Sequence, residues 1–119
     1  MSSPIPIVLI SGPVGVGKST VGGELAEVLE RDKTPHTFID FDHIRYTYPR
    51  PVDDPWGNRL GLANLSGIWA NCRKAGALNL VVSYVVEERS FLDSMLEIIP
   101  EGAISTIQLS ATLDSLKSR

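Results

Sequence analysis

Residues 12 to 20 read GPVGVGKST, a full match to the pattern G-x-x-x-x-G-K-[ST]. In this pattern successive backbone N–H groups curl around a phosphate, which requires glycine where a Cβ would collide or where φ turns positive. The apolar run of residues 5–10 precedes the pattern, and apolar side chains follow it at helical spacing from Val21 to Leu29. The sequence therefore predicts a strand, a phosphate-binding loop and a helix, in that order. The alternative is a glycine-rich turn that binds nothing.

The loop residues have expected roles in holding ATP and Mg²⁺. Lys18 is expected to reach the β- and γ-phosphates, the Ser19 hydroxyl to be a direct ligand of Mg²⁺, and Thr20 to add a hydroxyl near the α-phosphate. The positive N-terminal end of the following helix points at the same anion. The predicted nucleotide-contacting residues are Gly12, Pro13, Val14, Gly15, Val16, Gly17, Lys18, Ser19 and Thr20.

Length and composition narrow the class of protein. A chain of 119 residues is expected to be one domain, residues 1–119. It carries 11 Lys and Arg against 14 Asp and Glu, a net charge of −3, with no basic run, so no nucleic-acid partner is expected. Cys72 is the single cysteine, and the first apolar stretch is far shorter than the roughly 20 residues that span a bilayer. We expect a cytoplasmic protein without membrane contact.

Hydrophobic patterning predicts alternating elements. Residues 48–56, YPRPVDDPW, hold three prolines and two adjacent aspartates, and they are expected to form an irregular excursion. Strands are expected at residues 5–10, 37–40, 78–86 and 103–109, and helices at 18–30, 57–75, 87–99 and from 110 onward. This order predicts a three-layer α/β/α fold with a parallel sheet, whose ligands lie at the carboxyl ends of the strands.

Asp40 and Asp42, in the stretch FIDFDHIR, are the second candidate feature. Two carboxylates at i and i+2 of a strand end project to the same side, beside the predicted phosphate loop. One can hold metal-bound water while the other accepts a proton from a substrate hydroxyl. The alternative is that one of them caps a helix that starts near His43. Arg45 is interpreted either as a clamp for a substrate anion or as a solvated charge.

These motifs resemble the P-loop small-molecule kinases, the family that includes adenylylsulfate, shikimate and gluconate kinases. GPVGVGKST resembles the phosphate loop of this P-loop NTPase family, and FIDFDHIR resembles its Asp-x-Asp segment after the second strand. The resemblance implies a metal-shell role for Asp40 and contact with the acceptor hydroxyl for Asp42. The stretch RKAGALNLVVSYVVEER is similar to one in adenylylsulfate kinases, where a serine and an aromatic residue stand at the positions of Ser83 and Tyr84.

The chain departs from the family pattern in three places. Its third predicted strand lacks the aspartate that ends this strand in many P-loop ATPases, and Ser83 stands in that neighbourhood. The proline-rich residues 48–57 do not match the substrate segment of adenylylsulfate kinases. Family members continue past the equivalent of Arg119 with an arginine-bearing lid, so the C-terminal part of the fold is expected to be missing.

Acceptor recognition is expected from the excursion and the helix after it. The two tryptophans of this region have packing as an alternative role, because large aromatic side chains anchor loops as readily as they stack on ligands. The candidate acceptor-contacting residues are Arg50, Asp53, Asp54, Trp56, Arg59, Asn64 and Trp69.

The sequence predicts transfer of the γ-phosphoryl group of ATP·Mg to a hydroxyl of a small molecule, with Lys18, Asp40 and Asp42 in catalytic roles and Ser19 and Asp40 near the metal. The main alternative is a nucleotide-binding module or shortened regulator that binds ATP without efficient transfer. Residues 54–57 spell the D-x-x-G of GTPases, but no apolar strand precedes them and no Asn-Lys-x-Asp motif follows, which argues against a GTPase.

Overall fold

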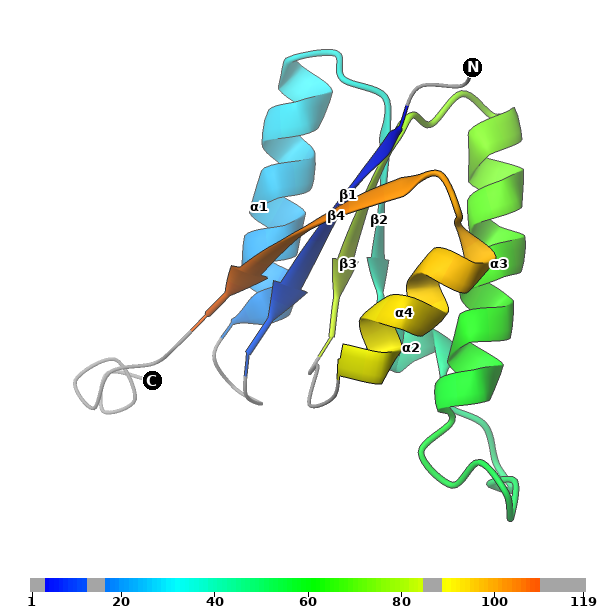
Figure 1. Ribbon diagram of the computed structural model, residues 1–119. Helices are drawn as coiled ribbons and strands as arrows, with labels where there is room; N and C mark the ends of the chain where they lie inside the picture. Colours follow the sequence, from blue (N-terminus) through cyan, green and yellow to red (C-terminus); the bar gives the residue numbers. More distant parts are fainter. Residues whose placement is uncertain (1–3, 13–16, 85–88, 110–119) are drawn as a thin grey trace, which may run out of the picture.

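The protein is described by a computed structural model that covers residues 4–12, 17–84 and 89–109. Its four strands form one sheet in which every paired strand is parallel (Figure 1). The strands are β1 (Ile5–Ser11), β2 (His36–Asp40), β3 (Asn79–Ser83) and β4 (Gly102–Gln108), in the order β2-β3-β1-β4. The parallel sheet predicted from the alternating pattern is thus confirmed.

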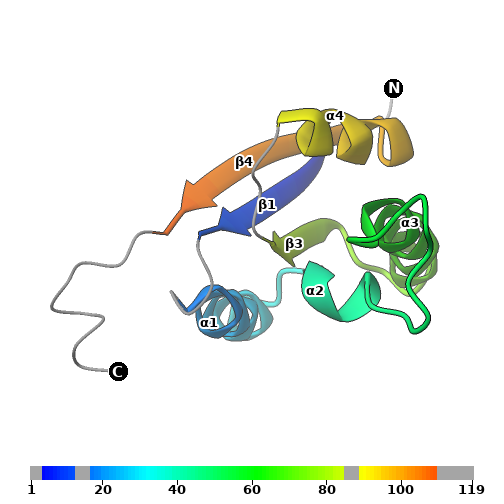
Figure 2. The ribbon, with the colours of Figure 1, turned by 90° about the horizontal axis from the view of Figure 1, so that it is seen from below.

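Helices cover both faces of the sheet. Helix α1 (Lys18–Arg31) lies on one face, and α3 (Asn58–Lys74) and α4 (Arg89–Ile98) lie on the other (Figure 2). A short helix, α2 (Phe41–Ile44), follows β2 directly. This arrangement confirms the predicted α/β/α layers. Within the described ranges, no helix combines the length and apolar character needed to cross a bilayer.

Element boundaries differ from the predicted ones by a few residues. The third strand was expected to reach residue 86, but β3 ends at Ser83. The helix expected from residue 110 lies outside the described residues, as do residues 85–88. The short helix α2 was considered only as an alternative reading of the aspartate segment, and the structure contains it.

The core lies between the sheet and the layer formed by α3 and α4. The central strands β1 and β3 are buried on both faces, which explains why their sequences read as continuous apolar runs. Trp69 of α3 is only 5% exposed in this core, so its alternative role as a packing residue is confirmed. The strands contribute Ile7, Leu9, Leu80 and Val82, and the helices contribute Leu65, Trp69, Phe91 and Met95.

Three aromatic rings anchor α2 against the carboxyl end of the sheet. The ring centroids of Phe41 and Tyr84 are 4.5 Å apart, and that of Phe91 lies 5.0 Å from Phe41 and 4.8 Å from Tyr84. Such pairs add about 0.5–1.5 kcal/mol each beyond their area burial. The cluster joins α2, the end of β3 and α4, and so it fixes the backbone that carries Asp42.

Candidate functional site

Helix α1 follows directly after Gly17, the last glycine of the predicted phosphate loop. Gly17 is the N-cap of α1 with φ 96° and ψ 26°, and it offers no side chain to cap the helix. A positive φ is one of the two reasons for which the pattern requires glycine. Lys18 is the first helical residue, Gly12 is buried after β1, and Thr20 is exposed. Pro13, Val14, Gly15, Val16 and the side chain of Ser19 lie outside the described residues.

Asp40 ends β2 and is the N-cap of α2. Its Oδ1 atom accepts a hydrogen bond from the backbone N–H of Asp42 at 3.1 Å, and its Oδ2 atom lies 3.9 Å from Nε2 of the exposed His43. The capping role considered for this segment is therefore confirmed for Asp40. Capping uses one lone pair of a carboxylate that has roughly four acceptor positions, so it is compatible with a second role for the same side chain.

Asp42 does not belong to a strand. We predicted that Asp40 and Asp42 share one side of a strand end, and this was wrong for Asp42 because it lies in the first turn of α2. Strand alternation therefore does not relate the two side chains. The Asp42 side chain is 44% exposed, and its Oδ1 atom accepts a hydrogen bond from Nε of Arg45 at 2.8 Å.

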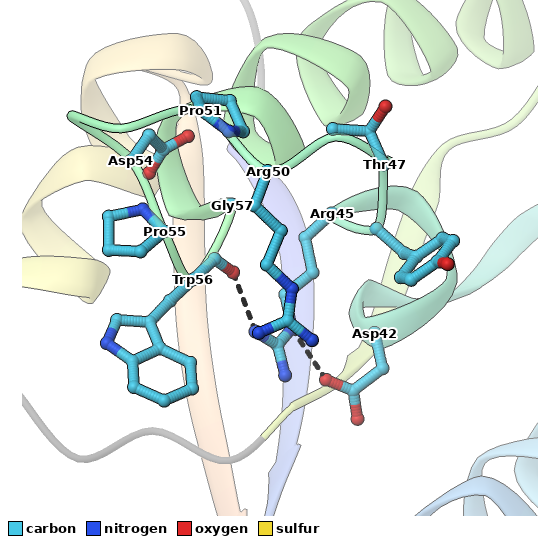
Figure 3. A pocket seen from close by; sticks show the side chains of 10 residues that line it. Asp42, Arg45, Thr47, Arg50, Pro51, Asp54, Pro55, Trp56 and Gly57 are labelled. Carbon is cyan, nitrogen blue, oxygen red and sulfur yellow. Dashed lines mark hydrogen bonds and ion pairs between the residues drawn. The ribbon is translucent and has the colours of Figure 1, made fainter.

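Arg45 connects three parts of the site. Besides Asp42, its Nη1 atom donates to the backbone oxygen of Trp56 at 2.7 Å (Figure 3). The guanidinium carbon of Arg45 also lies 5.4 Å from the ring centroid of Tyr84. Tyr84 in turn donates its hydroxyl to Oδ1 of Asn58 at 2.6 Å. Arg45 is thus a structural link between α2 and the excursion, a role that sequence reasoning did not consider.

The excursion and α2 enclose a small open pocket of about 160 Å³. The charged side chains along it are those of Asp42, Arg45, Arg50 and Asp54 (Figure 3). The Trp56 side chain, which is 69% exposed, forms part of its wall. The remaining lining residues are Tyr46, Thr47, Pro51, Pro55 and Gly57. The sequence pointed to the excursion, residues 48–56, but not to a pocket between it and α2. That pocket depends on how the excursion folds back onto α2.

The other acceptor candidates have structural roles. The Asp54 carboxylate, although it lines the pocket, accepts from the backbone N–H groups of Arg59 at 3.2 Å and Leu60 at 3.0 Å, and so caps α3. Asn64 donates from Nδ2 to the backbone oxygen of Ile44 at 2.7 Å, which ties α3 to α2. Trp69 lies in the core.

Asp53 and Arg59 form an exposed ion pair, with Nη2 of Arg59 2.7 Å from Oδ2 of Asp53. The hydrogen bond from Arg59 is the largest of the effects that hold the pKa of Asp53 below its ordinary value, and the same bond raises the pKa of Arg59. Arg59 also donates to the backbone oxygen of Asp53 at 2.9 Å. The pair holds the excursion against the start of α3, and neither residue lines the pocket.

Gly57 is expected to be sensitive to substitution. It is the N-cap of α3 with φ 71°, and a Cβ at this position would collide with the backbone oxygen of Arg45. We expect Gly57→Ala to lower the free energy of unfolding by about 2 kcal/mol or more, from the left-handed backbone and the collision together. Urea denaturation measures this loss.

The matched control is Gly67→Ala, in the interior of the same helix. No atom lies within 4 Å of a Cβ built at Gly67. Alanine is the better helix former by roughly 0.8–1 kcal/mol, so this variant is expected to be as stable as the wild type or more so. Equal losses of unfolding free energy in the two variants would show that the close approach of Gly57 to Arg45 does not contribute to stability.

The described residues do not form a protein cage for a metal ion. Among them, no group of three or more His, Cys, Asp or Glu side chains gathers closely enough to bind one. Mg²⁺ is commonly held by one or two protein oxygens, several waters and substrate phosphates. A cation at this site would therefore depend on a nucleotide for much of its coordination.

Comparison with known proteins gives one sequence relative and many structural neighbours. No family model matches the chain. A shikimate kinase from Psychrobacter sp. (strain PRwf-1) is 45% identical over 56 residues, which is 47% of this chain. The fold is similar to a gluconokinase from Sinorhizobium meliloti 1021, with 25% identity, a TM-score of 0.59 and 98% of this chain covered. It is also similar to an APS kinase from Thiobacillus denitrificans, with 17% identity, a TM-score of 0.61 and 88% of this chain covered.

The chain spans only part of each of these proteins. The sequence match covers 28% of the shikimate kinase. The structural matches cover 64% of the gluconokinase and 22% of the APS kinase. The APS kinase match, at its low identity, supports the fold alone. The activities of these longer proteins are therefore only hypotheses for this chain.

Proposed function

From its relatives in sequence and fold, which support membership of the P-loop small-molecule kinase family, we propose that this chain binds ATP with Mg²⁺ and transfers the γ-phosphoryl group to a hydroxyl of a small molecule. The observation that carries the proposal is the left-handed Gly17 directly before Lys18, at the start of α1 and after β1. This observation supports the proposal, because in a phosphate loop a left-handed glycine before the helix lets backbone N–H groups and a lysine face one anion.

The residues present fit a nucleotide and its cation. Helix α1 begins near the carboxyl end of β1. Asp40 is the last residue of β2, so it lies at the same edge of the parallel sheet, with β3 between the two strands. The Oγ atom of Ser83, at the end of β3, is buried and has no hydrogen-bond partner among the described residues. A buried hydroxyl without a partner among the described residues is a group that a hydrated cation can satisfy.

Each side chain then has a separate task. Lys18 would bind the β- and γ-phosphates as a point charge, the Ser19 hydroxyl would be a ligand of the cation, and Asp40 would lie near it. Mg²⁺, when bound, neutralises negative charge on the phosphates. Asp42 accepts the proton of the acceptor hydroxyl as the oxygen attacks the γ-phosphorus, while the bond from that phosphorus to the bridging oxygen breaks and leaves ADP.

The pocket beside Asp42 is the proposed acceptor site. Asp42 lines it with one carboxylate oxygen engaged by Arg45, which leaves the other for a substrate hydroxyl. The exposed indole of Trp56 and the guanidinium of Arg50 provide an apolar surface and a positive charge along the same pocket.

Two measurements test the proposed function. Isothermal titration calorimetry with ATP and Mg²⁺ is expected to show binding, and a panel of hydroxyl-bearing metabolites with γ-labelled ATP is expected to yield a labelled product. ATP binding without label transfer to any acceptor would favour the alternative, a nucleotide-binding module. Absence of ATP binding would contradict both functions.

A further inference from the structure

Tyr84 is a buried residue at the carboxyl edge of the sheet, and the proposed mechanism gives it no task. It directly follows β3, and its backbone N–H donates to the backbone oxygen of Ile10 in β1 at 3.0 Å. The residue is only 8% exposed. A buried tyrosine hydroxyl needs a hydrogen-bond partner. The partner that this hydroxyl has therefore indicates what the side chain supports.

The Tyr84 hydroxyl reaches the end of the excursion. It donates to Oδ1 of Asn58, which lies 26 residues earlier in the chain, at 2.6 Å. Asn58 is the first residue of α3 and directly follows Trp56 and Gly57, both of which line the pocket. The hydrogen bond thus ties the point where the excursion enters α3 to the carboxyl edge of the sheet.

The ring of Tyr84 supports the other side of the pocket. The guanidinium carbon of Arg45 lies 5.4 Å from the ring centroid, within the range of a cation–π interaction. The same guanidinium donates to the carboxylate of Asp42 and to the backbone oxygen of Trp56. One side chain therefore contacts two supports of the pocket, Arg45 through its ring and Asn58 through its hydroxyl.

The excursion is held at the surface by polar contacts rather than by burial of its large side chains. The side chains of Tyr46, Tyr48, Val52 and Trp56 are all exposed. Full burial of a large apolar side chain contributes about 1.5–3 kcal/mol, and these four residues do not make that contribution. The position of the excursion therefore depends on hydrogen bonds such as the one from Tyr84.

We propose that Tyr84 is a positioning residue of the acceptor site, which sets the wall at Trp56 relative to the base Asp42 through its contacts with Asn58 and Arg45. This inference rests on the proposed function. A substrate misplaced by about 1 Å can react about 100-fold more slowly, so the support of the walls matters for the reaction. The predicted nucleotide contacts, residues 12–20, lie outside this network, so the role concerns the acceptor and not ATP.

Tyr84→Phe tests the role, because it removes the hydroxyl and keeps the ring. The KM for the acceptor found in the metabolite panel is expected to rise about 2- to 10-fold, the size of one net hydrogen bond. The Kd for ATP, measured by calorimetry, is expected to stay within about twofold. A hydroxyl that only stabilised the fold would lower the melting temperature without a selective effect on the acceptor KM.

Variants of the partner residue test the hydrogen bond itself. Asn58→Ala is expected to raise the acceptor KM as Tyr84→Phe does, and the double variant is expected to show no further rise, because both changes remove one interaction. Asn58→Asp keeps an oxygen for the Tyr84 hydroxyl and is expected to retain the wild-type KM. Tyr48→Phe removes a hydroxyl from an exposed position in the same excursion and is the matched control, expected to match the wild type.

A wild-type acceptor KM in both Tyr84→Phe and Asn58→Ala would overturn the inference and leave the proposed function standing. Additive rises in the double variant would also overturn it, because the two side chains would then act separately. A parallel loss of ATP affinity would assign Tyr84 a general structural role in place of the proposed one. If the wild type transferred label to no acceptor, the proposed function would fail, and the inference with it.

Discussion

Lys18→Ala is expected to remove measurable ATP binding at ordinary protein concentrations. Lys18 is the first residue of α1 and directly follows the left-handed Gly17, the position from which the proposed function has its side chain reach the phosphates. Hydrogen bonds to charged groups contribute about 1.5–3 kcal/mol each. Loss of one such contact lowers affinity by about 10- to 150-fold, and loss of contacts to two phosphates by more.

Isothermal titration calorimetry with ATP and Mg²⁺ measures this loss, and circular dichroism verifies that the variant is folded. Lys74→Ala is the matched control, because Lys74 is an exposed lysine at the far end of α3. It removes the same charge from the chain and is expected to retain the wild-type affinity. Undiminished ATP binding by Lys18→Ala would refute the assignment of residues 12–20 as a nucleotide site.

The fold was largely predictable from the sequence because its signals are local. The apolar runs that became β1 and β3 are mostly buried, and continuous apolar runs of this length are typical of strands in a sheet covered on both sides. The spacing called for glycine at position 17, either because a Cβ would collide or because φ is positive, and the structure gives Gly17 a φ of 96°. Strands and glycine positions of this kind depend on residues that are close in the sequence, so a sequence pattern can reveal them.

The candidate site was less predictable because its contacts join distant segments. Arg45 bonds to Asp42 nearby but also to the backbone of Trp56 and the ring of Tyr84. An arginine that binds a backbone oxygen leaves no sequence pattern, since every residue carries that oxygen. The strand placement of Asp42 was wrong for a related reason. Capping by Asp40 starts α2 one residue after the strand ends, and the choice between strand and capped helix depends on the packing of Phe41.

Asp54 is a second residue whose role could not be predicted from the sequence. Its place before Gly57 resembles a catalytic D-x-x-G, yet the structure uses its carboxylate to cap α3 and uses Gly57 for a close approach to Arg45. Aspartate is a favoured capping residue and glycine a favoured turn residue, so a four-residue pattern does not distinguish structure from chemistry. Spatial contacts are needed to decide.

Asp42→Asn is expected to separate ATP binding from phosphoryl transfer. Asparagine keeps an oxygen that can accept the hydrogen bond from Arg45, so α2 and the excursion are expected to hold their positions. The amide cannot accept the proton of an acceptor hydroxyl. Loss of a general base typically lowers a rate by 10²- to 10⁴-fold, whereas ATP affinity is expected to remain within about twofold because Asp42 does not contact the phosphates in this mechanism.

Single-turnover transfer of label from γ-labelled ATP to the acceptor found in the metabolite panel measures the rate, and calorimetry measures the affinity. Asp93→Asn is the control, because Asp93 is an exposed aspartate of α4 on a different part of the surface. Transfer by Asp42→Asn at the wild-type rate would exclude Asp42 as the base. A parallel fall in ATP affinity would instead show that Asp42 acts through the position of Arg45 and the excursion, because a proton acceptor alone has no reason to affect nucleotide binding.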